Sequence, residues 1–258
     1  MKLFDSHCHL NDEKFNDDIE EVINNICKEG IINLVVAGYS VESSKKAIEI
    51  SKNKEFIYTT VGISPNDIPQ SEDELWKELD EIKEIIKTSK KIVAVGEIGL
   101  DYYWNKENKD LQKLAFIEQI KIANEFNLPI VIHTRDAYLD TIDILKNNNV
   151  VNKGVFHCCP QNLELIKSGL DLGFYISFAG PVTFKNAKNS SEVIKAVPIE
   201  KILTETDSPY LAPEPLRGTR NVPSNVKYVL EKIANVKELS IQEVEEIIIN
   251  NTKKIFKI

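Results

Sequence analysis

The four histidines of this chain share one feature, which is their position at the ends of predicted strands. His7 and His9 follow the first strand, His133 ends the fifth and His157 ends the sixth. Residues i and i+2 of an extended chain point to the same side, so His7 and His9 can bind one cation. A lone histidine at a strand end is usually a hydrogen-bonded structural residue. Four of them at one face of a sheet indicate a metal site, because neutral imidazole is a common ligand of divalent transition metals.

Two carboxylates occupy equivalent places in the sequence. Glu97 closes the run IVAVGE, and Asp207 follows the run KILTET. An acid buried at a strand end without a partner costs several kcal/mol, so a bound cation is a physical reason for its presence. Taken alone, either acid has a second interpretation as a helix N-cap or as an ion-pair partner of Arg135.

Four histidines and two acids exceed the four ligands of one tetrahedral site. They suit two metal ions about 3.5–4 Å apart that share a carboxylate. We expect Glu97 to be the bridge, because a carboxylate offers two oxygens whereas an imidazole offers one usable nitrogen. The remaining ligands divide into His7, His9 and Asp207 for one ion, and His133 and His157 for the other.

The elements that position these residues alternate along the chain. Short β-branched runs predict strands at 2–6, 32–37, 57–62, 92–97, 129–133, 154–157, 173–178 and 201–205. Helical spacing of apolar residues separates them, for example over 19–26, 75–86 and 114–123, and continues in the tail 225–257. Eight such units in about 250 residues predict an α/β fold, a single (β/α)8 TIM barrel over residues 1–258. The loop 207–224 contains four prolines and is expected to be functional.

Composition narrows the classes of function. A net charge of −8 opposes broad coating of nucleic acid, although a local site with cations can still meet one or two phosphates. The chain has no run of about 18 apolar residues, and its start does not resemble a secretory signal, so we expect no membrane span. The four cysteines suggest neither a disulfide framework nor a thiolate zinc site, and we expect a cytoplasmic protein.

Five runs together resemble one family. They are DSHCHL at 5–10, GEIGLD at 96–101, LPIVIHTRDA at 128–137, GFYISFAGPVTFKNA at 173–187 and ETDSPYLAPEPLRGTRN at 205–221. In this order, and over essentially the whole chain, they are similar to the TatD family of metal-dependent deoxyribonucleases. The resemblance implies a TIM barrel of the amidohydrolase superfamily that uses divalent ions (Mg²⁺, Mn²⁺ or Zn²⁺). The ligands that it implies are those reached from spacing: His7, His9, Glu97, His133, His157 and Asp207.

The resemblance also implies a substrate and a reaction. The substrate is DNA, as single strands or chain ends, with no membrane and no obligate protein partner. Metal ions activate a water that attacks phosphorus, and Asp207 and Glu97 are the catalytic carboxylates. The position of Asp207 in the superfamily suggests that it accepts the proton of that water. One departure from the family affects substrate preference: His157 is followed by Cys158-Cys159-Pro160 in place of a Cys-Phe-Ser/Thr-Gly run.

Other residues are predicted to support the reaction. Guanidinium groups bind phosphate in a bidentate manner, which makes Arg135, Arg217 and Arg220 candidate substrate contacts. Tyr102, with Tyr103 and Trp104, is a candidate for stacking on bases, although simple loop packing explains these aromatics equally well. We expect Asp101 and Glu205 to orient ligands from behind. For Glu205, a buried acid satisfied by neighbouring strands is an equal alternative.

Two other classes of function remain open. In the first alternative, the substrate of the same barrel is a small ester, an amide or an aminoacyl-tRNA, because a fold does not determine its function. The second alternative is a metal-bound scaffold that has lost hydrolysis, which the complete set of six ligands disfavours. Cys158 as a nucleophile is a minor possibility, since a cysteine at a strand end is more often a small buried hydrophobic residue.

Overall fold

Runs of Val, Ile and Leu form the strands because both faces of a parallel sheet are buried. The computed structural model describes residues 1–258. Its strands are β1 (Leu3–Cys8), β2 (Ile31–Ala37), β3 (Ile57–Val61), β4 (Ile92–Asp101), β5 (Ile130–Arg135), β6 (Gly154–Phe156), β7 (Tyr175–Phe178) and β8 (Ile202–Thr204). They form one sheet in sequence order, and each strand is parallel to the next. The predicted (β/α)8 barrel is therefore confirmed.

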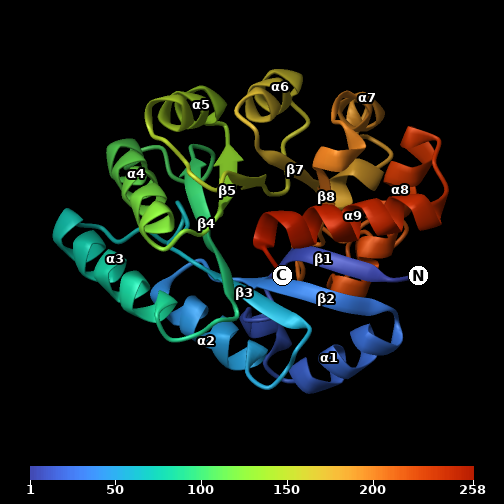
Figure 1. Ribbon diagram of the computed structural model, residues 1–258, viewed down its shortest axis with the longest axis horizontal. Coiled ribbons are helices and arrows are strands. Elements are labelled where there is room, and N and C mark those ends of the chain that lie inside the picture. Colours follow the sequence, from blue (N-terminus) through green and yellow to red (C-terminus); the bar gives the residue numbers. More distant parts are fainter.

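Helices surround the sheet (Figure 1). Seven of them connect successive strands: α1 (Ile19–Lys28), α2 (Val41–Ser51), α3 (Glu72–Ile86), α4 (Lys109–Glu125), α5 (Tyr138–Asn147), α6 (Leu163–Asp171) and α7 (Ser190–Ala196). The tail adds α8 (Val226–Lys237) and α9 (Ile241–Phe256), as its spacing predicts. Short 3-10 turns lie at η1 (Glu13–Phe15), η2 (Gly180–Thr183), η3 (Ile199–Lys201) and η4 (Pro223–Asn225). Because each connecting helix begins after a strand ends, the helix N-termini and the strand carboxyl ends share one face.

The core has two parts. A cluster of 58 buried residues fills the space between the strands and the surrounding helices. A second cluster of 10 combines residues from strands around the barrel, such as Phe4 and Val131, with Ile255 and Phe256 of α9. Helix α9 thus closes one end of the barrel, the end nearest the viewer in Figure 1.

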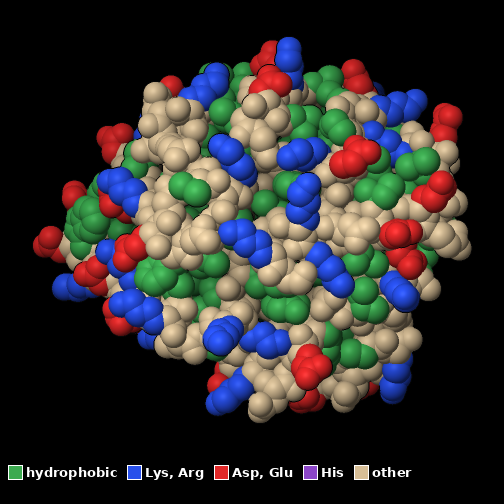
Figure 2. All heavy atoms as spheres, in the orientation of Figure 1, with side chains coloured by type: hydrophobic (Ala, Val, Ile, Leu, Met, Phe, Trp, Pro, Cys, Tyr) green, Lys and Arg blue, Asp and Glu red, His purple; other side chains and the backbone are tan.

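The face closed by α9 differs in composition from the predicted site. Figure 2 shows many Lys and Arg side chains on this face and no histidine. Helix C-termini point to this end of the barrel, and basic residues there complement the helix dipoles. None of the helices has the length and apolar character that crossing a membrane requires. All four cysteines are free thiols.

The join between β8 and β1 depends on side chains. Asp5 is fully buried in β1 and accepts hydrogen bonds from the backbone N–H of Thr206 at 2.9 Å and from its hydroxyl at 2.5 Å. Beyond these residues the two segments of the chain are joined by a backbone hydrogen bond, since Asp207 N–H donates to the carbonyl of His7 at 3.0 Å. Asp5 therefore holds the segment that carries Asp207 beside the segment that carries His7.

Three strands extend beyond their predicted carboxyl ends, so the predicted metal ligands on them lie inside the strands. β1 continues to Cys8 and includes His7, and β5 continues to Arg135. β4 continues from Glu97 to Asp101, so Glu97 lies inside the strand and not at its end. Gly99 lies in the added part of the strand with a φ of +142°, and a Cβ there would lie 2.0 Å from the carbonyl oxygen of His133. A glycine is needed because the two strands approach closely at this point.

Substitution of Asp5 should destabilise the barrel. In Asp5→Ala two buried donors of Thr206 lose their acceptor, and we expect the free energy of unfolding to fall by about 3 kcal/mol. For a chain of this size that loss lowers Tm by about 10 °C. Thermal unfolding at fixed metal concentration measures it, with the exposed Asp17→Ala as the matched control. Equal Tm values for the two variants would show that Asp5 does not hold the join.

Candidate metal centre

The six predicted ligands meet at the carboxyl end of the barrel. His7, Glu97 and His133 belong to strands, whereas His9, His157 and Asp207 lie one to three residues beyond a strand end. All strands of a parallel barrel end at the same face, so side chains far apart in sequence converge there. Most of these side chains are buried, and those of His133 and Asp207 are partly exposed toward a cavity.

The first group of ligand atoms surrounds one point. Nε2 of His7 lies 3.2 Å from Nε2 of His9, and Oε2 of Glu97 lies 3.4 Å and 3.6 Å from these two nitrogens. Oδ1 of Asp207 completes the group at 3.6 Å from His7 and 3.2 Å from His9. Four ligands about 2.1 Å from a tetrahedral ion stand about 3.4 Å from one another. These four atoms therefore match the spacing that such an ion requires.

The second group shares Glu97 with the first. Oε1 of Glu97 lies 2.9 Å from Nδ1 of His133 and 3.2 Å from Nε2 of His157. The two histidine nitrogens are themselves 3.2 Å apart. Each oxygen of Glu97 thus faces a different pair of imidazoles. These groups could hold two metal ions with Glu97 between them.

Three histidines have their outer ring nitrogen held by an acceptor. Carbonyl and carboxylate oxygens only accept, so the outer nitrogen donates its N–H and the inner nitrogen keeps a lone pair for a cation. The pairs are His9 Nδ1 with the Ala37 carbonyl at 3.3 Å, His133 Nε2 with Asp101 at 3.0 Å, and His157 Nδ1 with Glu205 at 3.3 Å. This arrangement fits a metal-binding role for all three rings.

The two acids of the centre are held in their ionised form. Burial by itself raises the pKa of Glu97, but the imidazoles of His157 and His133, when they carry protons in place of a cation, outweigh it, and the pKa lies well below its usual value. Burial likewise opposes ionisation of Asp207, and a protonated His9 beside it lowers its pKa nevertheless. Anionic oxygens with neutral imidazoles form a donor set that suits divalent ions.

Asp101 and Glu205 each contact the outer ring nitrogen of a predicted ligand, His133 and His157 respectively. Asp101 contacts His133 and also accepts hydrogen bonds from the backbone N–H groups of Tyr103 at 2.9 Å and Trp104 at 3.0 Å. Burial alone would raise the pKa of Asp101, but the hydrogen bond from His133 and those from the backbone lower it to about 2. Glu205 is fully buried and accepts from the backbone N–H of Cys158 at 2.6 Å as well as contacting His157.

A cavity of about 980 Å³ opens over the centre. Five of the six ligands line it, all except His7. Arg135 lines it too, with its guanidinium 3.9 Å from the ring centroid of Tyr103 and 5.4 Å from that of Trp104. No other Arg or Lys lines this cavity, so Arg135 is the one fixed positive charge at its wall.

The other predicted substrate contacts lie outside the cavity. The guanidinium of Arg217 covers Phe184 at 4.3 Å, and the Tyr102 hydroxyl donates to Asp140 at 2.6 Å. Arg220 binds the Asp18 carboxylate and donates to the carbonyl of Lys14 at 2.7 Å. It therefore ties the loop after β8 to the loop after β1. The sequence around these residues shows their type but not the direction in which each side chain points.

Sequence reasoning did not single out several residues of the cavity wall. Tyr39, Asp67 and Tyr210 follow β2, β3 and β8, and each lines the cavity. Asp67 accepts a hydrogen bond from Ser64 at 2.6 Å, and burial raises the pKa of its carboxyl. Their position just after strand ends was the available signal, because every loop at this face borders the site.

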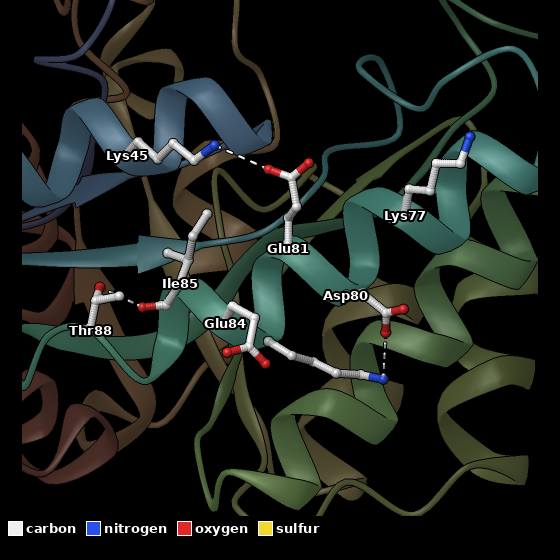
Figure 3. A pocket seen from close by; sticks show the side chains of 8 residues that line it. Lys45, Lys77, Asp80, Glu81, Glu84, Ile85 and Thr88 are labelled. Carbon is white, nitrogen blue, oxygen red and sulfur yellow. Dashed lines mark hydrogen bonds and ion pairs between the residues drawn. The ribbon is translucent and has the colours of Figure 1, made fainter.

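A second hollow lies outside the barrel, between α2 and α3 (Figure 3). Its volume is about 610 Å³, and charged side chains line most of it. Several of these pair with one another, as Lys45 does with Glu81 at 3.1 Å and Lys83 with Asp80 at 3.2 Å. It contains no histidine or cysteine, and the groups of residues that could hold a metal ion lie at the mouth of the barrel instead.

Comparison with known proteins gives one consistent result. The family model described as TatD related DNase matches residues 4–257. The uncharacterized metal-dependent hydrolase YabD of Bacillus subtilis is 44% identical to this chain and covers 99% of each sequence. The uncharacterized metal-dependent hydrolase YcfH of Escherichia coli K12 is 35% identical, over 100% of this chain and 97% of its own length.

A solved structure agrees with these relatives. The TatD homologue YJJV of Escherichia coli K12 superposes with a TM-score of 0.93 at 25% identity. The match covers 99% of this chain and 98% of that protein, which is nearly the whole barrel.

The contact between Asp101 and His133 predicts an effect on metal affinity. In Asp101→Asn the amide oxygen can still accept from Tyr103 and Trp104, which turns the amide N–H groups toward the His133 N–H. This clash favours the wrong tautomer of His133, and we expect divalent-ion affinity to fall about 10–100-fold. Competition with a chelating dye measures the affinity, and the exposed Asp110→Asn is the control. Unchanged affinity would limit Asp101 to anchoring its loop.

Proposed function

The chain belongs to the TatD related DNase family of metal-dependent hydrolases, and we propose that its substrate is the phosphodiester bond of DNA. The observation that carries this proposal is the position of Glu97, whose two oxygens face two separate groups of ligand atoms. Such an arrangement suits a pair of divalent ions, Mg²⁺, Mn²⁺ or Zn²⁺, that clamp both sides of a phosphoryl group. We propose that two ions bind, with Glu97 as their shared ligand.

When bound, the ions supply an acidified water and offset the charge that develops on the phosphate oxygens. The chain contributes the remaining parts of the reaction. Asp207 borders the cavity as an ionised carboxylate, and we propose that it accepts the proton of the attacking water. Asp101 and Glu205 hold His133 and His157 in place while this occurs.

The charges around the cavity support an anionic substrate that arrives with, or after, the metal ions. Four carboxylates line the wall, namely Asp12, Asp67, Glu97 and Asp207, against the single guanidinium of Arg135. Without cations this wall repels phosphate, so DNA binding and metal binding should be linked. We propose that Arg135 holds a phosphate oxygen, because planar guanidinium binds phosphate in a bidentate manner.

The form of the DNA substrate and the compartment of the protein are parts of the same proposal. A net charge of −8 disfavours long contact with duplex DNA, so we propose that single strands or chain ends enter the cavity. The four free thiols suit a reducing compartment, and we propose the cytoplasm.

Hydrolysis of labelled single-stranded DNA tests the proposal. The purified protein is treated with a chelator, and Mg²⁺, Mn²⁺ or Zn²⁺ is restored singly. We expect cleavage that depends on the ion, and a loss of several orders of magnitude in Glu97→Ala and His133→Ala, because each removes a ligand. The exposed Glu107→Ala, on the loop after β4, should cleave at the wild-type rate.

Two outcomes would contradict parts of this proposal. Near-wild-type turnover of Glu97→Ala would exclude a shared metal ligand at that position. Absence of cleavage by wild-type protein with ions bound would reject DNA as the substrate and redirect the search to small esters, amides and aminoacyl-tRNA.

Arg135 and Arg217 make a matched pair for testing the phosphate contact. Arg135→Ala should raise KM for a phosphodiester about tenfold with little change in kcat, because it removes binding that ground state and transition state share. Arg217→Ala should change KM less, since its guanidinium lies over Phe184 outside the cavity. Steady-state kinetics compares them. The reverse order would place the phosphate contact in the proline-rich loop.

A further inference from the structure

We propose that the mouth of the barrel holds a nucleoside on each side of the cleaved phosphate, one on Tyr210 beside Lys14 and one on Trp104 beside Arg135. This inference rests on the proposed function and specifies how that site takes its substrate. It requires two exposed aromatic side chains on opposite sides of the metal centre, each with a cation next to it. We call the rings of Tyr210 and Trp104 the two platforms.

Strand order places the two platforms opposite each other. Trp104 follows β4 and Tyr210 follows β8, and in a barrel with strands in order from β1 to β8 these two strands are diametrically opposed. Both aromatic residues nevertheless line the same cavity. The centre built on Glu97 lies between them, because five of its six ligands line that cavity as well.

The platform at Tyr210 is held rigidly. Its hydroxyl donates to Asp12 at 2.6 Å, and 43% of the residue remains exposed. Nζ of Lys14 lies 4.3 Å from the ring centroid, and the ring of His9 lies 6.4 Å away at a steep angle. A base on this ring would therefore lie beside a metal ligand, and its outer phosphate would meet the ammonium of Lys14.

Arg220 supports this platform from outside. It donates to the backbone carbonyl of Lys14 and pairs with Asp18, so it ties the loop bearing Asp12 and Lys14 to the loop bearing Tyr210. Asn221 adds a hydrogen bond to the carbonyl of Tyr210 at 2.8 Å. A preorganised aromatic ring loses little freedom when a base stacks on it, which favours binding.

The platform at Trp104 is tied to the metal centre through Asp101. The same carboxylate accepts from the backbone N–H of Trp104 and contacts His133. Trp104 is 68% exposed, and the Arg135 guanidinium lies over the rings of its loop, 3.9 Å from the centroid of Tyr103 and 5.4 Å from that of Trp104. Base and phosphate would thus be held by neighbouring side chains at a fixed distance from His133.

Exposed apolar side chains gather at this end of the molecule. Eight large hydrophobic residues are exposed in the whole chain. Five of them lie in loops after strands or in the first turn of a helix at the carboxyl end of the barrel: Tyr103, Trp104, Leu139, Leu163 and Tyr210. Such a concentration at one opening is typical of a ligand-binding surface. Stacking on nucleobases uses rings of this kind without regard to base identity.

Three phosphodiesters that differ in their nucleosides separate the two platforms. They are a short single-stranded oligodeoxythymidylate, thymidine 5′-(p-nitrophenyl phosphate) and methyl p-nitrophenyl phosphate, with nucleosides on both sides, one side and neither side. We expect Tyr210→Ala and Trp104→Ala each to lower kcat/KM on the oligonucleotide about tenfold more than on the methyl ester. The double variant should lose about a hundredfold more, because the two residues act on separate nucleosides.

One conservative variant and one substitution of a tryptophan outside the cavity serve as controls. Trp104→Phe should recover most of the oligonucleotide activity, because phenylalanine also stacks. Trp76→Ala removes an exposed tryptophan of α3 that does not line the cavity and should leave all three rates unchanged. Equal losses on the three substrates, or no loss on the oligonucleotide, would overturn the proposal that the mouth holds a nucleoside on each side of the cleaved phosphate.

Fluorescence gives a readout that is independent of turnover. The chain has two tryptophans, so Trp76→Phe leaves Trp104 as the only one. A phosphorothioate oligodeoxythymidylate, added to this protein with Mn²⁺ bound, should quench and shift its emission as a base stacks on the indole. Methyl phosphate should not. Unchanged emission at saturating oligonucleotide would reject the Trp104 platform.

These results also separate the inference from the function on which it rests. If wild-type protein hydrolyses none of the three phosphodiesters with any ion, the proposed function fails and the inference with it. If it hydrolyses all three and the Tyr210 and Trp104 variants match wild type on each, the proposed function stands. Only the proposal of two nucleoside-binding aromatic residues then fails.

Discussion

One carboxylate, that of Glu97, faces two pairs of imidazoles at once. Its oxygens lie 3.4 Å and 3.6 Å from His7 and His9 on one side, and 2.9 Å and 3.2 Å from His133 and His157 on the other. This geometry requires four separate segments of chain to hold their positions to within about 0.5 Å. Parallel strands that pair in sequence order meet that requirement, because each ladder sets the height of the next strand.

The residues around the centre each serve two elements at once. Asp5 joins the segment that carries His7 to the segment that carries Asp207. Asp101 holds His133 and also the turn that presents Trp104. Arg220 ties the first and last loops of the barrel together. The metal centre and the walls of its cavity are therefore one connected structure, and movement of a loop would displace a ligand.

Several features could be read from the sequence because they depend on local pattern. The alternation of apolar runs with helical spacing predicts a barrel, and the tail pattern predicts α8 and α9. The HxH spacing at His7 and His9 places two imidazoles on one side of a strand, whatever surrounds them. Acids and histidines near the carboxyl ends of strands converge in any parallel barrel, so the sequence could predict that these six residues lie together.

Tertiary structure decided what depends on direction and on neighbours. The sequence alone determined that arginines and aromatics lie in the loops, but only the fold turned Arg135 toward the cavity and Arg220 toward Asp18. It also extended β4 past Glu97, because Gly99 lets the strand run against His133 despite an interrupted pattern. Residue type and spacing are local properties of the chain. The direction of a loop side chain is set by contacts with segments as distant as Lys14 is from Arg220, which no local pattern encodes.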